Sequence, residues 1–251
     1  MPDHRKHRGP GPNDVRWFNT RSMPVLVAAV HDLSWLLSRG YAEPSTLKLV
    51  GDRWGLTERQ RLAVKRAACS DLARAGRIAR RTAFEELKGQ ALWIDGFNLV
   101  LTIESALGGG VLIRGRDGAI RDLASVHGSY RKVSETLPAL QAIGQVLAEA
   151  QPDQVRWLLD QPVSNSGRLK TLIRELAETH GWNWSAELEF NPDVPLGRSS
   201  AVVATADSGI LDRCARWTNL ADAVIEREIP HAWMLDLGQP DREGLPPCGV
   251  E

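Results

Sequence analysis

The sequence has few of the features that mark secreted, membrane or zinc-binding proteins. Its cysteines number three, without a CxxC spacing, so neither a disulfide framework nor a zinc site is expected. No stretch approaches the ~18 consecutive apolar residues of a membrane-spanning helix. The N-terminal MPDHRKHRGPGPND also lacks the apolar run of a signal peptide. These absences predict a cytoplasmic protein with reduced thiols and no membrane partner.

Two common catalytic motifs are missing as well. The glycines Gly108–Gly110 are not followed by the Lys-Ser/Thr pair of a phosphate-binding P-loop. No GxSxG elbow is present, which argues against an α/β-hydrolase. Nucleotide hydrolysis of the P-loop kind and serine-based ester hydrolysis are therefore not expected.

The charges are unevenly distributed, although the formal net charge is zero. Residues 1–90 carry 17 Lys and Arg against 9 Asp and Glu, whereas residues 91–251 carry 14 against 22. Such a division predicts two units with different electrostatic roles. A basic unit attracts polyanions, and an acidic unit can hold cations. The alternatives are that the acidic unit is merely well solvated, or that the two halves attract each other.

The first 90 residues are predicted to be helical and basic. Residues 1–22 are rich in Pro, Gly, Arg and His and are expected to be flexible. In residues 23–90, apolar spacing and breakers predict a helix over 23–40, a short helix over 45–50 that Gly51 ends, and a basic helix after Thr57. Thr57 and Gln60 have the spacing of a capping box.

This arrangement of short helix, turn and basic helix resembles a helix-turn-helix. Arg59, Lys65 and Arg66 would lie on the outer side of the basic helix and could contact nucleic acid. The alternative is that they form a solvated face. Residues 80–90 are expected to link this unit to the second half of the chain.

From residue 91 the pattern predicts an α/β fold, with a mostly parallel sheet covered by helices over 91–238 and a tail over 239–251. Strands are expected at ALWID, QVRWLLD, NWSAELEF, AVVATAD and HAWMLDL, and a hairpin around Asp117–Gly118. Helices are expected over 122–131, 134–150, 167–180 and 208–217. Strands that alternate with helices favour a parallel sheet, whose ligands bind beyond the carboxyl ends of the strands.

Three of the apolar runs end in a carboxylate: Asp95, Asp160 and Asp207. Parallel strands would bring all three to one edge, where like charges repel unless a cation or protons neutralise them. Carboxylate oxygens suit Mg²⁺ or Mn²⁺, and such ions assist phosphodiester hydrolysis. The alternative for each Asp is a helix N-cap or a turn residue after a strand.

The segment LWIDGFNLV resembles the opening strand of NYN-type and YacP-like members of the PIN nuclease superfamily. The resemblance implies that Asp95 is a metal ligand and that Asn98 helps to shape the site. VVATADSGIL resembles a later strand of that superfamily and implies a second ligand at Asp207, whereas Asp160 matches less specifically. A further acid from a helix is also implied, with Glu135, Asp122 and Glu104 as candidates.

The chain is also similar to the family called domain of unknown function 434, over most of residues 24–237. Segments that carry this similarity are SWLLSRGYAEPSTLKLVGDRWGLTERQRLAVKRAACS, LWIDGFN, DLASVHGSYRKV, LLDQPVSNSGRL and VVATADSGILDRCARW. The family name implies no activity.

Other polar residues are candidates for contact with nucleic acid. Asn165 and Arg168 lie where the polar loop after Asp160 opens a helix and could hold a phosphate. His127 and Arg131 share a helix face, and Arg114 and Arg116 lie in the hairpin. Ordinary capping or solvation is the alternative for all of them.

Together these patterns predict a Mg²⁺- or Mn²⁺-dependent phosphodiester hydrolase that acts on RNA rather than DNA. Asp95, Asp160 and Asp207 would hold the metal, and Asn98 would orient a ligand or the scissile phosphate. One alternative is a non-catalytic nucleic-acid-binding protein with a degenerate PIN-like domain. Another is a hydrolase of small phosphate compounds that uses the same carboxylates.

Overall fold

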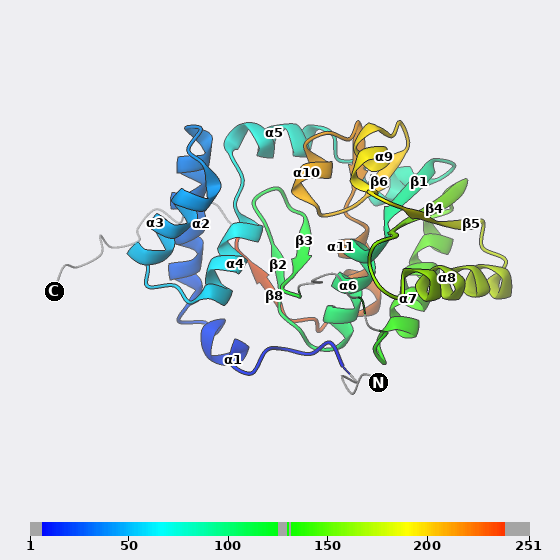
Figure 1. The fold of residues 1–251 in the computed structure, drawn as a ribbon, viewed down its shortest axis with the longest axis horizontal. Helices are drawn as coiled ribbons and strands as arrows, with labels where there is room; N and C mark the ends of the chain where they lie inside the picture. The colour runs from blue at the N-terminus through cyan, green and yellow to red at the C-terminus, as the bar shows by residue number, and fades with distance from the viewer. Residues whose placement is uncertain (1–6, 125–129, 131, 239–251) are drawn as a thin grey trace.

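A computed structural model of the chain describes residues 7–124, 130 and 132–238. The molecule has three parts along its longest axis: a group of helices, a small three-stranded sheet, and a larger sheet covered by helices (Figure 1). The α/β architecture with N-terminal helices is therefore confirmed.

The N-terminal helices are α1 (Asp14–Trp17), α2 (Met23–Ser38), α3 (Glu43–Arg53), α4 (Glu58–Ala67) and α5 (Asp71–Ala79), followed by the 3-10 helix η1 (Phe84–Leu87). The strands after them are β1 (Ala91–Asp95), β2 (Leu112–Arg114), β3 (Ile120–Asp122), β4 (Gln154–Asp160), β5 (Trp184–Glu189), β6 (Val202–Ala204), β7 (Arg216–Thr218) and β8 (Met234–Asp236). The helices between them are α6 (Gly96–Leu107), α7 (Thr136–Ala150), α8 (Ser166–His180), α9 (Asp193–Arg198), α10 (Ser208–Leu211) and α11 (Leu220–Glu228).

The larger sheet is parallel throughout, in the order β5-β4-β1-β6-β7. Helices cover both faces of this sheet. Alternate residues of a strand point to opposite faces, so each strand contributes to both cores. In β1, Leu92 and Ile94 pack into the core formed with α6, α7, α8 and α11. Trp93 points the other way, toward residues of α9 and α10.

The order of the strands places a switch point beside β1. From β1 the chain goes to β4 and β5 on one side, and then crosses to β6 and β7 on the other. In open α/β sheets, ligands bind at such a point beyond the carboxyl ends of the strands. The topology therefore predicts a ligand site beyond the carboxyl ends of β1 and β6.

The small sheet, in the order β3-β2-β8, lies between the helical part and the larger sheet (Figure 1). The predicted hairpin is confirmed, with Gly118 at a φ of 79° in its turn. Ile113 and Leu235 pack into a core with the N-terminal helices, whereas Leu112 and Ile120 face the core of the larger sheet. The helical unit predicted over 23–90 therefore shares its core with the small sheet.

The N-terminal helices follow the predicted pattern with one exception. The capping box of α4 is confirmed, because the side chains of Thr57 and Gln60 each accept a hydrogen bond from the other's backbone N–H. The break predicted at Gly51 is wrong, since α3 continues to Arg53. A β-carbon at Gly51 would meet the guanidinium of Arg61, so the Arg61 side chain would have to move.

Two helices of the second half were also predicted wrongly. Asp122, expected to begin a helix, is the last residue of strand β3, and residues 125–129 and 131 lie outside the described part. The helix expected over 208–217 ends at Leu211, and Arg216–Thr218 is strand β7. That strand forms because Trp217 O accepts a hydrogen bond from Thr82 N while β6 pairs with its other side.

The expected flexible N-terminus differs from the structure over residues 7–22. This segment contains α1, and Asp14 and Phe18 are buried. Arg8 Nε donates to Glu104 of α6 at 2.6 Å, and Arg59 of α4 donates to Asp14 through two nitrogens at 2.6 and 2.7 Å. The segment therefore joins the helical part to the α/β part along one edge of the molecule (Figure 1).

Candidate functional site

Four adjacent strands each deliver one carboxylate toward the carboxyl edge of the larger sheet. Asp95 ends β1 and Asp160 ends β4. Asp207 follows β6 and Asp193 follows β5, each at the start of a short helix. The pattern of apolar runs ending in Asp thus predicted correctly that Asp95, Asp160 and Asp207 come from neighbouring parallel strands. Their role in metal binding stays a prediction.

Asp95 is the buried centre of this group, with 8% of its surface exposed. Burial, together with the negative charges of Asp207, Asp160 and Asp193, raises the pKa of its carboxyl to about 7. A hydrogen bond from Thr205 Oγ1 to Asp95 Oδ2, at 2.8 Å, works in the opposite direction. Asp95 is therefore a carboxyl that protons or a cation would neutralise.

The other acids interact with one another in the same way. Burial and the charge of Asp193 raise the pKa of Asp160. Burial and the charge of Asp207 raise the pKa of Asp193, whereas Arg213 lowers it. We refer to Asp95, Asp160, Asp193 and Asp207 as the carboxylate cluster.

Asp193 was not predicted from the sequence as a site residue. It lies four residues beyond the last residue of β5, after an Asn-Pro pair, so no apolar run ends directly in it. The available signal was the same one that marked the other acids, namely a predicted strand followed closely by a carboxylate. Its charge acts on Asp95 and Asp160, and this interaction makes Asp193 part of the group.

The three acids proposed as a fourth ligand have other partners. Asp122 accepts from Thr102 at 3.0 Å and lies 3.5 Å from Arg66 Nη1. Glu104 is fully buried and accepts from three side chains: Tyr130, Thr136 and Arg8. Glu135 contacts His7 at 2.8 Å. Because Asp193, and none of these three, contributes to the raised pKa of Asp95, it is the better candidate for the fourth acid.

The carboxylate cluster has the chemistry of a site for a hard divalent cation, since it offers only oxygen donors. In this conformation, no group of three or more described His, Cys, Asp or Glu side chains lies close enough to hold a metal ion. Asp193 and Asp207 are exposed at the starts of short helices. One oxygen of Asp207 accepts from Ile210 N, as the helix-cap alternative predicted, and its carboxylate has a second oxygen.

The backbone that leads to Asp207 is held from three sides. Asn98 Oδ1 accepts from Ala206 N at 2.9 Å, and Arg121 Nε donates to Ala206 O at 2.8 Å. Thr205 Oγ1 accepts from Asp207 N at 3.0 Å. Asn98 therefore shapes the site by binding the chain itself, and its amide oxygen is already engaged.

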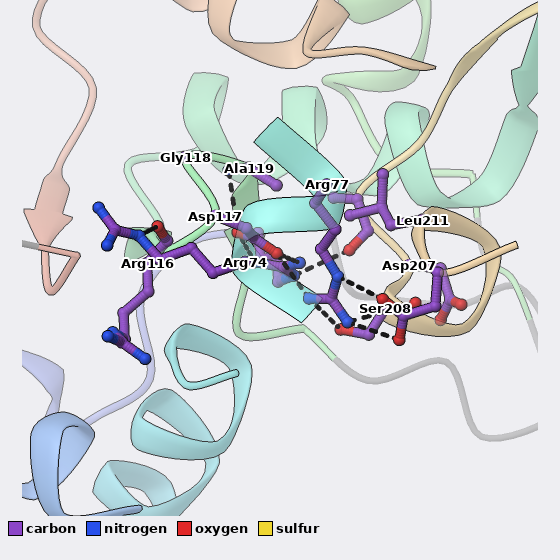
Figure 2. A network of polar contacts seen from close by, with 12 residues as sticks. Arg74, Arg77, Arg116, Asp117, Gly118, Ala119, Asp207, Ser208 and Leu211 are labelled. Atoms are coloured by element: carbon purple, nitrogen blue, oxygen red, sulfur yellow. Dashed lines mark hydrogen bonds and ion pairs between the residues drawn. The ribbon is translucent and has the colours of Figure 1, made fainter. Parts of the chain in front are cut away.

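A buried ionic network supports this segment from α5 (Figure 2). Arg77, 3% exposed, donates to Asp117 at 2.7 Å and to Asp212 at 2.7 and 2.8 Å, and it reaches the carbonyl of Ser208. Arg121 donates to Asp117 from the other side. Although burial opposes ionisation, these two guanidiniums hold the pKa of Asp117 at about 2. Sequence reasoning missed this network because its members are far apart in the chain.

A cleft of about 600 Å³ opens between α4, α5 and the end of β6. Its polar lining includes Lys65, Arg66, Asn98, Arg121, Asp207 and Ser208. The cleft reaches the carboxylate cluster at Asp207. Its basic and acidic side chains largely pair with one another, so it is not a uniformly positive groove.

The basic residues predicted to contact nucleic acid make contacts within the chain. Besides Asp14, Arg59 binds the carbonyl of Leu123 at 3.1 Å. Lys65 pairs with Glu43 at 2.7 Å, and Arg66 donates to the carbonyls of Asp122 and Ala124. The outer side of the predicted recognition helix α4 is therefore turned toward its own protein, and its role in RNA binding stays a prediction.

The remaining predicted contacts are more varied. Arg114 forms a bidentate ion pair with Asp222, and Arg116 forms an ion pair with Asp71. Asn165 is exposed and donates to Tyr130 O at 2.8 Å, and Arg168 is exposed in the first turn of α8. His127 and Arg131 lie outside the described residues.

The fold and the carboxylate cluster define an α/β protein with acids gathered at the sheet switch point, and comparisons place it in a family. The chain belongs to the family described as a domain of unknown function, DUF5616, whose model matches residues 84–223. The family described as a protein of unknown function, DUF434, matches residues 25–80. The resemblance to domain 434, expected over most of residues 24–237, is thus confirmed for residues 25–80, and residues 84–223 match the second family instead.

One relative is the uncharacterized protein MJ0935 of Methanocaldococcus jannaschii. It is 28% identical over 183 residues, which make up 73% of this chain and 87% of the relative. No solved structure matches the chain. Within the described residues, no helix is long and apolar enough to cross a membrane.

Proposed function

We propose that the protein is a metal-dependent phosphodiester hydrolase of the PIN/NYN type, with RNA rather than DNA as its substrate. The observation that carries the proposal is the buried carboxyl of Asp95, whose pKa is raised to about 7 by burial and by three further acids at the same edge. Such a gathering of negative charge lowers the stability of the fold. Acids with raised pKa values cluster at functional sites, where this loss of stability serves the chemistry.

The carboxylate cluster differs from the structural acids of the same protein. Asp117 and Asp222 are neutralised by arginines within hydrogen-bond distance. In the described part of the chain, no Lys or Arg forms an ion pair with any member of the cluster within 4.0 Å. A divalent cation is the partner that would balance it.

The residues of the chain then have distinct tasks. Asp95, Asp160, Asp193 and Asp207 would hold one or two Mg²⁺ or Mn²⁺ ions. When bound, such ions activate water and stabilise the leaving oxygen of a phosphodiester. Thr205 would orient the carboxyl of Asp95, and Asn98 and Arg121 would keep the peptide before Asp207 in place. The choice of RNA rests on the resemblance of LWIDGFNLV and VVATADSGIL to the PIN superfamily.

The test compares Asp95→Asn with Asp153→Asn, a variant of an exposed acid at the opposite edge of the sheet, just before β4. Purified proteins are incubated with labelled RNA, DNA and a phosphate monoester in Mg²⁺ or Mn²⁺. We expect wild type and Asp153→Asn to cleave RNA, and Asp95→Asn to lose cleavage while its circular dichroism stays unchanged.

Three outcomes would contradict the proposal. Absence of any metal-dependent cleavage by the wild type, together with RNA binding, would favour the non-catalytic alternative. Cleavage of the monoester alone would favour a small-molecule phosphatase. Equal activity of Asp95→Asn and wild type would remove the carboxylate cluster from the reaction.

A further inference from the structure

A second pocket of about 600 Å³ lies at the amino edge of the larger sheet, opposite the carboxylate cluster. Its walls come from the segments just before β1 and β6, from the first residue of β7 and from α9. Ala91 lines this pocket and Asp95 belongs to the cluster, so the length of β1, roughly 13 Å, separates the two. The pocket is therefore distinct from the candidate active site, and its volume is in the range of sites for small molecules.

Two guanidiniums line this pocket without a carboxylate to neutralise them. Arg198 is exposed at the end of α9, and Arg216 is the first residue of β7. In the part of the chain that the structure describes, neither forms an ion pair with an Asp or Glu, and no acidic residue lines the pocket. The pocket is therefore positively charged and suited to an anion.

The guanidinium of Arg216 is held across the starts of two neighbouring strands. Its Nη1 donates to Gln90 Oε1 at 3.2 Å, just before β1, and its Nη2 donates to Ser200 O at 3.4 Å, just before β6. Both partners are neutral, so they orient the guanidinium and leave its charge uncompensated. Because a guanidinium has more N–H donors than these two contacts use, donors remain for a ligand.

The indole ring of Trp93 forms an apolar part of the same pocket. It lies on the face of the sheet that α9 covers and is partly exposed. The guanidinium of Arg156, the neighbour of Trp93 in the sheet register, lies 4.5 Å from the ring centroid and donates to Glu187. Arg156 therefore helps to fix the ring, and a fixed ring offers a flat ligand group a surface to pack against at low entropic cost.

We propose that this pocket binds a small phosphate monoester that carries a flat ring, namely a nucleoside monophosphate. A phosphate monoester has a charge of about −1.5 to −2 at neutral pH, which the two guanidiniums of Arg198 and Arg216 balance. The planar fork of a guanidinium also matches the spacing of phosphate oxygens. The base would then pack against Trp93. This site is additional to the proposed function and does not depend on it.

Isothermal titration calorimetry of the full chain, in the presence of a chelator, tests the site without a contribution from metal at the carboxylate cluster. The probes are adenosine monophosphate, cyclic adenosine monophosphate, whose phosphodiester carries a single charge, and adenosine, which carries none. The variants are Arg198→Gln, Arg198→Lys and Arg216→Gln. Arg168→Gln is the matched control, because Arg168 is an exposed arginine in the first turn of α8, at the carboxyl edge of the sheet. Circular dichroism and Tm show whether each variant is folded.

We expect wild type to bind adenosine monophosphate saturably, and Arg198→Gln and Arg216→Gln each to weaken that binding by roughly 10- to 150-fold, the range for hydrogen bonds between charged groups. Arg198→Lys should lie between wild type and Arg198→Gln, because lysine keeps the charge and loses the planar fork. Arg168→Gln should bind like wild type. Cyclic adenosine monophosphate should bind more weakly than the monoester, and adenosine more weakly still.

Absence of saturable binding of adenosine monophosphate to the wild type would overturn the proposal. Wild-type affinity in folded Arg198→Gln, or equal affinities for adenosine monophosphate and adenosine, would overturn it as well. Loss of binding in Arg168→Gln alone would place the nucleotide at the carboxyl edge instead. RNA cleavage does not enter these measurements, so an absence of cleavage would contradict the proposed function and leave this site standing.

Discussion

The hydroxyl of Thr205 donates a hydrogen bond to Asp95 Oδ2 over 2.8 Å and so joins the ends of two neighbouring strands. Thr205 Oγ1 itself accepts a hydrogen bond from Asp207 N at 3.0 Å. One small side chain therefore orients the buried carboxyl and also the backbone of a second acid. The contact with Asp95 is buried, where hydrogen bonds are most costly to lose, and the contact with Asp207 N is partly buried.

Replacement of Thr205 by Val keeps the shape of this side chain and removes its hydroxyl. We expect a loss of about 1–3 kcal/mol in the free energy of unfolding, because the buried Asp95 and Asp207 N lose their partner. RNA cleavage should fall as well. Urea unfolding and cleavage rates measure the two effects. Thr205→Ser, which retains the hydroxyl, should keep activity, and equal defects in both variants would contradict this explanation.

The titration of Asp95 predicts how stability depends on pH in the absence of metal. The folded pKa is about 7 against an ordinary value of 3.8, so the unfolded chain releases this proton first. The stabilisation from the protonated carboxyl is complete below about pH 4 and is lost as pH rises through about 7. Asp95→Asn, which stays neutral, should be more stable than wild type at pH 8, by an amount on the order of a few kcal/mol.

This difference should shrink at pH 4, where the wild-type carboxyl is protonated in the folded state. Thermal unfolding in the presence of a chelator, from pH 4 to pH 8, is the measurement. Asp153→Asn, with its exposed acid, should follow the wild type throughout. A stability difference between Asp95→Asn and wild type that does not change with pH would show that Asp95 ionises normally.

Addition of Mn²⁺ or Mg²⁺ at pH 8 should reverse the order. A cation that binds only the folded protein raises its Tm in a concentration-dependent manner. We expect this rise in the wild type, a need for more metal in Asp193→Asn, and no rise in Asp95→Asn. Glu135→Gln is the control that separates the two candidates for the fourth acid. If metal raises the Tm of Asp193→Asn as in the wild type but raises that of Glu135→Gln less, Glu135 rather than Asp193 is the fourth acid.

Four of the five strands of the larger sheet were predictable because each is a local apolar run, and three of the four acids are visible at the ends of such runs; β7 was predicted as helix. Asp193 was not visible in this way, because an irregular turn separates it from β5. The fit of Asn98 to the Ala206 peptide was equally hidden. It joins residues 108 positions apart, and only their packing in three dimensions brings them together.

The glycine-rich segment 108–110 illustrates the same limit. The sequence showed that it is no P-loop, and the structure shows its actual role. A β-carbon on Gly108 or Gly110 would press against the carbonyl of Arg8, at 2.6 and 3.3 Å, so the N-terminal segment lies over the end of α6. The partners of the basic side chains on α4 were hidden for a related reason. Its arginines bind Asp14 and backbone carbonyls that no local pattern could pair with them.

Arg77 provides the last prediction, because it connects α5 to the segment that follows Asp207 (Figure 2). Arg77→Met leaves Asp117 buried with one cation fewer, so we expect a loss of about 3–5 kcal/mol in the free energy of unfolding. Adding Asp117→Asn removes the uncompensated charge and should recover part of that loss. Arg77→Lys keeps the positive charge but loses the planar guanidinium, which donates to Asp212 and to the Ser208 carbonyl at the same time.

If Arg77 positions the Asp207 segment, Arg77→Lys should therefore require more Mn²⁺ for half-maximal cleavage than wild type does, at temperatures where both are fully folded. Arg156→Lys is a suitable comparison, because Arg156 also forms a two-pronged pair, with Glu187 on the sheet away from α5. Circular dichroism, urea unfolding and the metal dependence of cleavage give the three measurements. Equal metal requirements in Arg77→Lys and Arg156→Lys would mean that Arg77 stabilises the fold alone and leaves the position of Asp207 unaffected.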